Sequence, residues 1–189
     1  MDLRLQGTFT AAEAASNGMS RRELQRMLTE GKIERISWGL YRHTDEEPAD
    51  NDLIEIAAKA HQPTLCLVSA LARHELTDII PPAHDVALPR GTWRPRVSTP
   101  VHWHSFDAAT FDIGRDECPV DDTHSIGVYN APRSVVDAYR LRREVGLDIA
   151  SEALRRWLRH GGEPAEVMRI TNSFPAAKPA VLNALRILL

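Results

Sequence analysis

Thr10-Ala11-Ala12-Glu13 and Ser20-Arg21-Arg22-Glu23 are two helix-start signals ten residues apart, and they decide the fold of the first part of the chain. In each, a hydroxyl residue followed three positions later by glutamate fits the capping box, which satisfies free amide hydrogens at a helix N-terminus. Asn17-Gly18 can end the first helix and Gly31 the second, because these residues tolerate the left-handed backbone of a C-cap. The sequence therefore predicts a helix, a tight turn and a helix, which is the outline of a helix-turn-helix.

The second predicted helix has an apolar side and a polar side. Met19 before the Ser20 cap and Leu24 inside the helix form a hydrophobic staple, and Leu24, Met27 and Leu28 follow helical spacing. The opposite side offers groups that bind bases or phosphates, since arginine pairs with guanine and glutamine with adenine. These candidate DNA contacts are Ser20, Arg21, Arg22, Gln25, Arg26 and Thr29. An ordinary solvated helix has the same composition, so this helix alone leaves both interpretations open.

A basic β-hairpin is predicted directly after this helix. Lys32–Ser37 alternates polar and apolar residues, Trp38-Gly39 can turn the chain, and Leu40–Arg42 can return. A hairpin in this place is the wing of a winged helix-turn-helix. Its candidate phosphate contacts are Lys32, Arg35 and Arg42. Trp38 is a further candidate DNA contact that could rest on a sugar, although packing of the indole over its own hairpin is the favoured interpretation.

Charge separates a mildly basic first segment from an acidic remainder. The chain of 189 residues is 43% hydrophobic and can bury a core in one large domain or two small ones. Its net charge is −3, from 23 Lys+Arg and 26 Asp+Glu; residues 1–42 carry seven and five of these, or +2, which leaves −5 for residues 43–189. A segment this weakly basic would need more than one copy per DNA site to bind tightly.

The sequence predicts a winged helix-turn-helix domain over residues 1–43, an acidic, proline-broken linker over 44–51 and a second domain over 52–189. The fold class is α+β, with a small, mostly antiparallel sheet and C-terminal helices in the second domain. Helices are expected over Asp52–His61, over Leu65–Leu76 and from Ala131 onward, and strands over Asp85–Pro89, Pro100–Ser105 and Ser125–Tyr129.

The residues do not favour an enzyme, a cofactor or a metal site. His102 and His104 alternate on a predicted strand, with His84 and His124 as further candidates, but metal sites usually need three or four preorganised ligands. His74 is expected to be a hydrogen-bonded structural histidine. No Gly-x-Ser-x-Gly elbow and no glycine-rich loop with a following lysine is present. A metal-dependent or nuclease-type enzyme in residues 52–189 stays open as a third interpretation.

Other features of the sequence indicate the cellular compartment and one ion pair. Cys66 and Cys118 lack metal-binding spacing, and we expect no disulfide between them. No secretion signal is recognised at the N-terminus and no apolar stretch is long enough for a membrane span, so we expect a cytoplasmic protein. Arg133 and Asp137, four positions apart on a predicted helix, are expected to pair with each other or with a neighbouring helix.

Three blocks of the chain resemble the AbiEi-type antitoxins of type IV toxin–antitoxin systems. Phe9–Arg42 is similar to the family's winged helix, with a Gly-x-Ser start to the recognition helix and a Trp-Gly-Leu-Tyr-Arg hairpin return. Ser69–Asp78 resembles Ser-Ala-Leu-x-x-His-Gly-Leu-Thr, with Glu75 in place of the glycine. Ala131–Asp137 is close to an Arg-Thr-x-x-Asp helix start. The family usually has a longer first helix, for which Leu3 and Leu5 could supply a short version; otherwise the head would be poorly braced or would borrow support from the second domain.

The resemblance implies an antitoxin that binds inverted repeats in operator DNA, represses its own operon and counteracts a nucleotidyltransferase-like toxin. An acidic run suits a basic protein surface, although it is more commonly a solvated loop; it comprises Asp107, Asp112, Asp116, Glu117, Asp121 and Asp122. The alternative function is a protein-interaction module whose winged helix no longer binds DNA. The low positive charge and the short segment before Phe9 favour that alternative.

Overall fold

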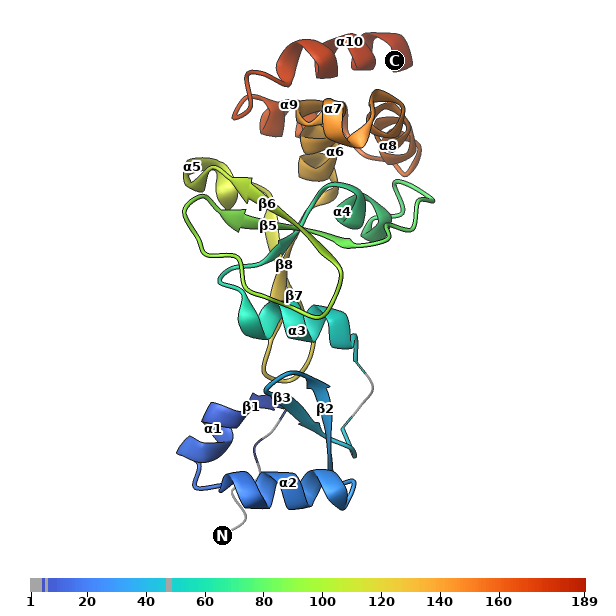
Figure 1. The fold of residues 1–189 in the computed structure, drawn as a ribbon. Helices are drawn as coiled ribbons and strands as arrows, with labels where there is room; N and C mark the ends of the chain where they lie inside the picture. The colour runs from blue at the N-terminus through green and yellow to red at the C-terminus, as the bar shows by residue number, and fades with distance from the viewer. Residues whose placement is uncertain (1–4, 6, 47–48) are drawn as a thin grey trace. The chain divides into compact units, whose positions relative to one another are not determined.

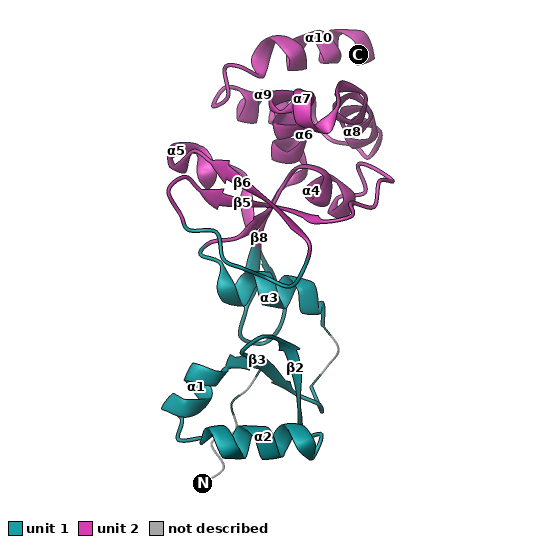
Figure 2. Ribbon diagram, viewed as in Figure 1, with its two compact units in different colours: residues 1–61, 93–99, 118–126 teal, residues 62–92, 100–117, 127–189 magenta. Residues whose placement is uncertain are grey.

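The computed structural model describes residue 5, residues 7–46 and residues 49–189 (Figure 1). The chain divides into two compact units, which we describe separately. Unit 1 comprises residues 1–61, 93–99 and 118–126, and unit 2 comprises residues 62–92, 100–117 and 127–189 (Figure 2). Both units contain helices and strands, so the expected α+β class is confirmed. The linker at residues 44–51 stays a prediction, and its residues Glu47 and Pro48 lie outside the described part of the chain.

Two short helices and a three-stranded sheet form the first part of unit 1, which we call the head (residues 8–43). The helices are α1 (Ala11–Ser16) and α2 (Arg21–Thr29). The strands β2 (Ile33–Ser37) and β3 (Leu40–His43) form the predicted hairpin. The strand β1 (Thr8–Thr10), which the sequence did not predict, pairs antiparallel with β3 and gives the order β1-β3-β2. Their shared core is Phe9, Ala14, Leu24, Ile33 and Tyr41.

The helix-end signals of the sequence explain the turn between α1 and α2. Thr10 forms the complete capping box with Glu13. Ser20 accepts a hydrogen bond from the Glu23 amide at 3.2 Å, but no return bond is described, and the Glu23 carboxylate lies 3.7 Å from Arg26 instead. The second capping box is therefore only half formed. Gly18 (φ +82°) ends α1 in the left-handed conformation that the sequence predicts.

The hairpin is short, and its turn is covered by the start of α1. Trp38 and Gly39 make the turn, with Gly39 at φ +77°. The Gly39 carbonyl accepts a hydrogen bond from the Ala11 amide at 3.1 Å. A bulge between Arg35 and Ser37 shifts the register of β2 against β3. The turn is thus fixed by the helix next to it.

The head is braced inside unit 1 by residues that the sequence analysis assigned to the second domain. Thr123 Oγ1 donates a hydrogen bond to the Thr8 carbonyl at 3.3 Å. A side chain at Gly7 would meet Thr123, since a Cβ there would lie 2.6 Å from it. Leu5 packs, partly buried, against the head core, whereas Leu3 lies outside the described residues. Among the described residues before Phe9, Thr8 therefore begins strand β1 and Leu5 adds one apolar contact.

Unit 1 also contains α3 (Asn51–Lys59), which begins at the Asp50 cap. The Asp50 carboxylate accepts hydrogen bonds from the Asp52 and Leu53 amides at 3.1 and 3.2 Å. Leu53, Ile54 and Ile56 are buried, as the helical spacing in the sequence predicts. The charged residue among them, Glu55, is buried as well and binds the loop formed by residues 93–99.

Unit 2 contains most of a five-stranded sheet of order β6-β5-β4-β8-β7. Its strands are β4 (Thr64–Leu65), β5 (His84–Pro89), β6 (Val101–Phe106), β7 (Arg115–Pro119) and β8 (Ser125–Tyr129). The β4–β5 pair is antiparallel, but the β4–β8 and β5–β6 pairs are parallel. The expectation of a mostly antiparallel sheet is wrong, because the connection from β5 to β6 crosses over instead of forming a hairpin.

Helices from the second half of the chain form the main core of unit 2. The C-terminal helices are α6 (Ala131–Arg140), α7 (Arg142–Val145), α8 (Leu147–Arg159), α9 (Pro164–Thr171) and α10 (Lys178–Leu188). Two shorter helices are α4 (Leu67–Arg73) and α5 (Ala108–Phe111). The residues around Leu65 form β4, so the helix predicted from Leu65 begins two residues later. No helix in the described part of the chain is long and apolar enough to cross a membrane.

A buried ion group explains the Arg-x-x-x-Asp spacing at the start of α6. Arg133 Nε donates to Asp137 at 2.9 Å, and both side chains are fully buried. Arg140 Nε donates to the other carboxylate oxygen at 3.0 Å. The Arg133 guanidinium also lies over the rings of Tyr129 and Phe174, at 4.1 and 4.3 Å from their centroids. The predicted pairing of Arg133 with Asp137 is confirmed, and it is a structural contact.

Candidate nucleic-acid interface

The outer side of α2 is exposed and polar, as its sequence predicts. Leu24 is 6% exposed and faces the head core, while the side chains on the opposite side are exposed. Ser20, which precedes this helix, uses its hydroxyl to cap it, and the Thr29 hydroxyl donates to the Gln25 carbonyl at 3.0 Å. The exposed set is Arg21, Arg22, Gln25, Arg26 and Thr29. The structure thus gathers one half of the candidate site on a single helix.

Carboxylates neutralise part of the positive charge at this surface. Arg26 lies 3.7 Å from Glu23 and 3.7 Å from Glu30. The Lys32 ammonium lies 2.7 Å from Glu30, and this hydrogen bond lowers the pKa of the Glu30 carboxyl. All of these pairs are solvent-exposed, so each contributes little to stability and exchanges easily for another partner. Arg21 and Arg22 have no ion-pair partner among the residues that the structure describes.

The hairpin presents one arginine together with two aromatic rings. The Arg35 guanidinium lies 5.8 Å from the ring centroids of both Trp38 and Tyr41. Trp38 itself is 83% exposed, so the expectation that its indole packs over the hairpin is wrong.

Arg42 is the one hairpin candidate that the fold buries. Its side chain is 8% exposed, and its Nε and Nη2 both donate to Glu34 Oε1, at 3.1 and 2.5 Å. The alternation of residues along β3 does not predict this burial. All four residues of the strand are buried, because β3 is the central strand between β1 and β2. We assign Arg42 to the stability of the hairpin and propose no phosphate contact for it.

The first part of the chain also matches a known family. Residues 2–43 match the family model described as transcriptional regulator, AbiEi antitoxin. The AbiEi match ends at the last residue of β3, so it contains α1, α2 and the hairpin. Every candidate contact from Ser20 to Arg42 falls inside it. No curated protein matches the chain. The family resemblance proposed from sequence is therefore confirmed for the N-terminal stretch.

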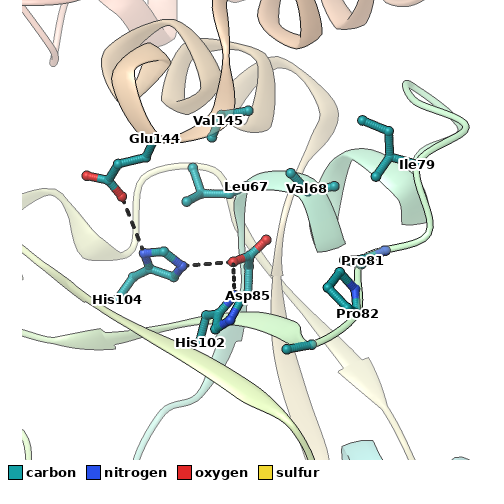
Figure 3. A pocket seen from close by; sticks show the side chains of 11 residues that line it. Leu67, Val68, Ile79, Pro81, Pro82, Asp85, His102, His104, Glu144 and Val145 are labelled. Carbon is teal, nitrogen blue, oxygen red and sulfur yellow. Dashed lines mark hydrogen bonds and ion pairs between the residues drawn. The ribbon is translucent and has the colours of Figure 1, made fainter.

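Outside the AbiEi match, unit 2 holds a cavity of about 360 Å³ that contains the two alternating histidines (Figure 3). His104 Nε2 donates to Asp85 at 2.9 Å, and His102 lies 3.7 Å from the same carboxylate oxygen. Glu144 lies 4.0 Å from the other ring nitrogen of His104. The remaining walls are apolar, formed by residues such as Leu67 and Val145. Among the described residues, no group of three or more His, Cys, Asp or Glu could hold a metal ion.

Other residues considered for chemistry have structural partners. His74 Nε2 donates to the Tyr129 carbonyl at 2.8 Å, which confirms that this residue is a hydrogen-bonded structural histidine. His124 pairs with Asp121 at 3.1 Å in unit 1. Cys66 is fully buried, and burial raises the pKa of its thiol, which disfavours the reactive thiolate. These observations leave the exposed side of α2 as the strongest candidate site.

Proposed function

We propose that the chain is an antitoxin-type transcriptional regulator that binds operator DNA, with residues 8–43 forming a winged helix-turn-helix. The observation that carries the proposal is the exposed polar side of α2, with Arg21, Arg22 and Gln25 opposite the buried Leu24. The AbiEi match over the same residues supports it. A major groove admits one α-helix, and side chains of these types pair with base edges and phosphates there.

The positions on the head suggest a role for each candidate. Arg22, Gln25 and Arg26 lie on the outer side of α2, where we assign them to base edges. Arg21 at the start of the helix, Lys32 after its end and Arg35 on the hairpin are assigned to phosphates, and Trp38 to a sugar next to Arg35. Binding would exchange the exposed pairs of Arg26 with Glu23 and Glu30 for contacts to DNA, at small cost.

The head carries few cationic side chains that can contact phosphates, and binding to inverted repeats would compensate for this. Three phosphate contacts from one head give modest affinity, and two heads on two half-sites would double them. We therefore propose that two or more copies bind one operator and repress the operon that encodes the chain. We also propose that the chain acts in the cytoplasm and counteracts a nucleotidyltransferase-like toxin encoded beside it, as a regulator and without catalysis of its own.

A mobility shift tests this proposal. The probe is the duplex upstream of the chain's own gene, and the proteins are the wild type, Arg22→Ala/Gln25→Ala/Arg26→Ala, and Arg143→Ala, an exposed arginine on α7, as a matched control. We expect a salt-sensitive shift for the wild type and the control, at a lower protein concentration than for a scrambled duplex, and we expect the triple variant to need more protein and to lose this preference. A triple variant that shifts the duplex as the wild type does would refute the assignment of α2. Coexpression with the neighbouring gene, with growth as the readout, tests the antitoxin part.

One observation favours the alternative, a protein-interaction module. Glu30 binds both Lys32 and Arg26, which lowers the positive potential at the end of α2. An interaction module would show no salt-sensitive shift on any duplex. The same experiment therefore separates the two functions.

A further inference from the structure

The loop of residues 93–99 in unit 1 exposes an indole beside two arginines. Trp93 is 73% exposed, which leaves most of a large apolar ring in water. Arg94 and Arg96 are exposed as well, and neither has an ion-pair partner among the described residues. The stretch from Arg90 to Thr99 contains no acidic residue. The loop therefore presents a cationic and aromatic surface. It lies outside the helix-turn-helix and hairpin from which the candidate DNA contacts were predicted.

The loop is held firmly at two points, so its exposed side chains are presented by a fixed backbone. Pro95, between the two arginines, is buried. The Ser98 and Thr99 amides each donate to the Glu55 carboxylate at 3.0 Å, and the Thr99 hydroxyl donates to it at 2.9 Å. Lys59 pairs with the same carboxylate at 2.7 Å. The anchor, Glu55, belongs to α3 of the same unit (Figure 2).

We propose that this loop is a second nucleic-acid contact, in which Arg94 and Arg96 bind phosphates and Trp93 packs against a sugar or an unpaired base. Guanidinium groups with no internal carboxylate are free to bind phosphate, and an exposed indole is the usual platform for stacking a base. The Arg35–Trp38 pair of the head is the same combination in the same unit. Nucleic acid is favoured over an acidic protein surface because the head of the same unit carries the same arginine–tryptophan pair and matches a family described as transcriptional regulators. The proposal deepens the proposed function and rests on it for the identity of the partner.

The loop would bind a sugar–phosphate chain, and two kinds of nucleic acid could supply it. Different probes distinguish them. One is duplex DNA around the operator, and the other is a single strand with unpaired bases. The loop variant Trp93→Ala/Arg94→Ala/Arg96→Ala changes only exposed side chains, so we expect its circular dichroism and melting temperature to match the wild type. Arg143→Ala on α7 of unit 2 is the control for loss of an exposed arginine.

The experiment measures the affinity of the full chain and these variants for the upstream duplex and for a single-stranded oligothymidine, over a range of salt concentrations. We expect the loop variant to bind at least one probe at least about fivefold more weakly. Its slope of log affinity against log salt should fall by about 2 on a duplex, because two phosphate contacts are lost. Loss on the duplex alone identifies the duplex as the source, and loss on oligothymidine identifies unpaired bases.

Unchanged binding of both probes by a folded loop variant would overturn this inference. The triple variant of α2, measured in parallel, shows whether a failure concerns the loop or the proposed function. If the α2 variant loses the duplex and the loop variant does not lose either probe, the proposed function stands and the second contact is refuted. If the loop variant loses a probe while the α2 variant binds normally, the second contact stands and the assignment of α2 fails.

Discussion

Replacement of Glu55 by glutamine should destabilise the folded chain, because this carboxylate is buried and fully hydrogen-bonded. Glu55 is 2% exposed and accepts hydrogen bonds from Ser98, Thr99 and Lys59. Glutamine keeps one acceptor oxygen and turns its NH2 group either toward the Ser98 and Thr99 amides or toward the Lys59 ammonium. In either orientation a donor that Glu55 satisfies loses its acceptor.

The pKa of Glu55 gives the size of the effect. Burial raises this pKa, but the hydrogen bonds from Lys59, Ser98 and Thr99 outweigh burial and lower it from 4.5 to about 2. That fall corresponds to about 3 kcal/mol in favour of the ionised form in the folded chain. We therefore expect Glu55→Gln to lower the free energy of unfolding by about 3 kcal/mol at neutral pH, within the range for hydrogen bonds to a buried charge.

The sign of the pH dependence follows from the lowered pKa. The contribution of Glu55 is complete above its unfolded pKa of 4.5 and is lost as the pH falls through about 2. Urea denaturation followed by circular dichroism should show this loss in the wild type between about pH 4.5 and 2 and should not show it in Glu55→Gln. Glu152→Gln is the matched control, because its partners Arg155 and Arg156 are solvent-exposed or half-buried. A difference below about 1 kcal/mol for Glu55→Gln, or the same value as the control, would refute the reasoning.

Three further predictions concern other positions. Gly18→Ala forces a side chain into φ +82° and should lower the free energy of unfolding of the head by about 1 kcal/mol, measurable as a lower melting temperature. Asp137→Asn leaves Arg133 and Arg140 without their shared carboxylate and should cost about 3–5 kcal/mol in urea denaturation, so a native-like midpoint would contradict the ion group as described. Trp38→Ala removes an indole that is 83% exposed and should change stability by less than about 0.5 kcal/mol; equal affinity of this variant and the wild type for the upstream duplex would remove Trp38 from the proposed interface.

Local signals in the sequence predicted the head because each of them is satisfied by neighbouring residues. The Thr10 and Ser20 caps and the left-handed Gly18 need no distant partner. The outer side of α2 followed directly from these, since helical spacing places Leu24 inside and the arginines outside. Most of the candidate contacts on this helix were therefore placed correctly as exposed residues.

Features that depend on distant partners could not be read in the same way. Thr8–Thr10 becomes a strand only because β3 lies beside it, and Arg42, which pairs with Thr8, is buried in the resulting sheet. The helix predicted from Leu65 begins only at Leu67, because a strand of two residues, Thr64–Leu65, is too short to show a period. Parallel pairing of β5 with β6 depends on the path of the chain between them. The exposed loop around Trp93 has no periodicity at all, and the only signal for it is three arginines and a tryptophan without an acidic residue.

The central claim, that the exposed side of α2 reads DNA, is tested most directly by fluorescence anisotropy of the upstream duplex and a scrambled duplex over a range of salt concentrations. For the wild type we predict tighter binding of the upstream duplex and a slope at least as steep as about −3 per chain, of which the phosphate contacts by Arg21, Lys32 and Arg35 supply about −3. Arg22→Ala/Gln25→Ala/Arg26→Ala should lose the preference between the two duplexes. Equal affinity of the wild type for both, or an unchanged preference in the triple variant, would contradict the claim.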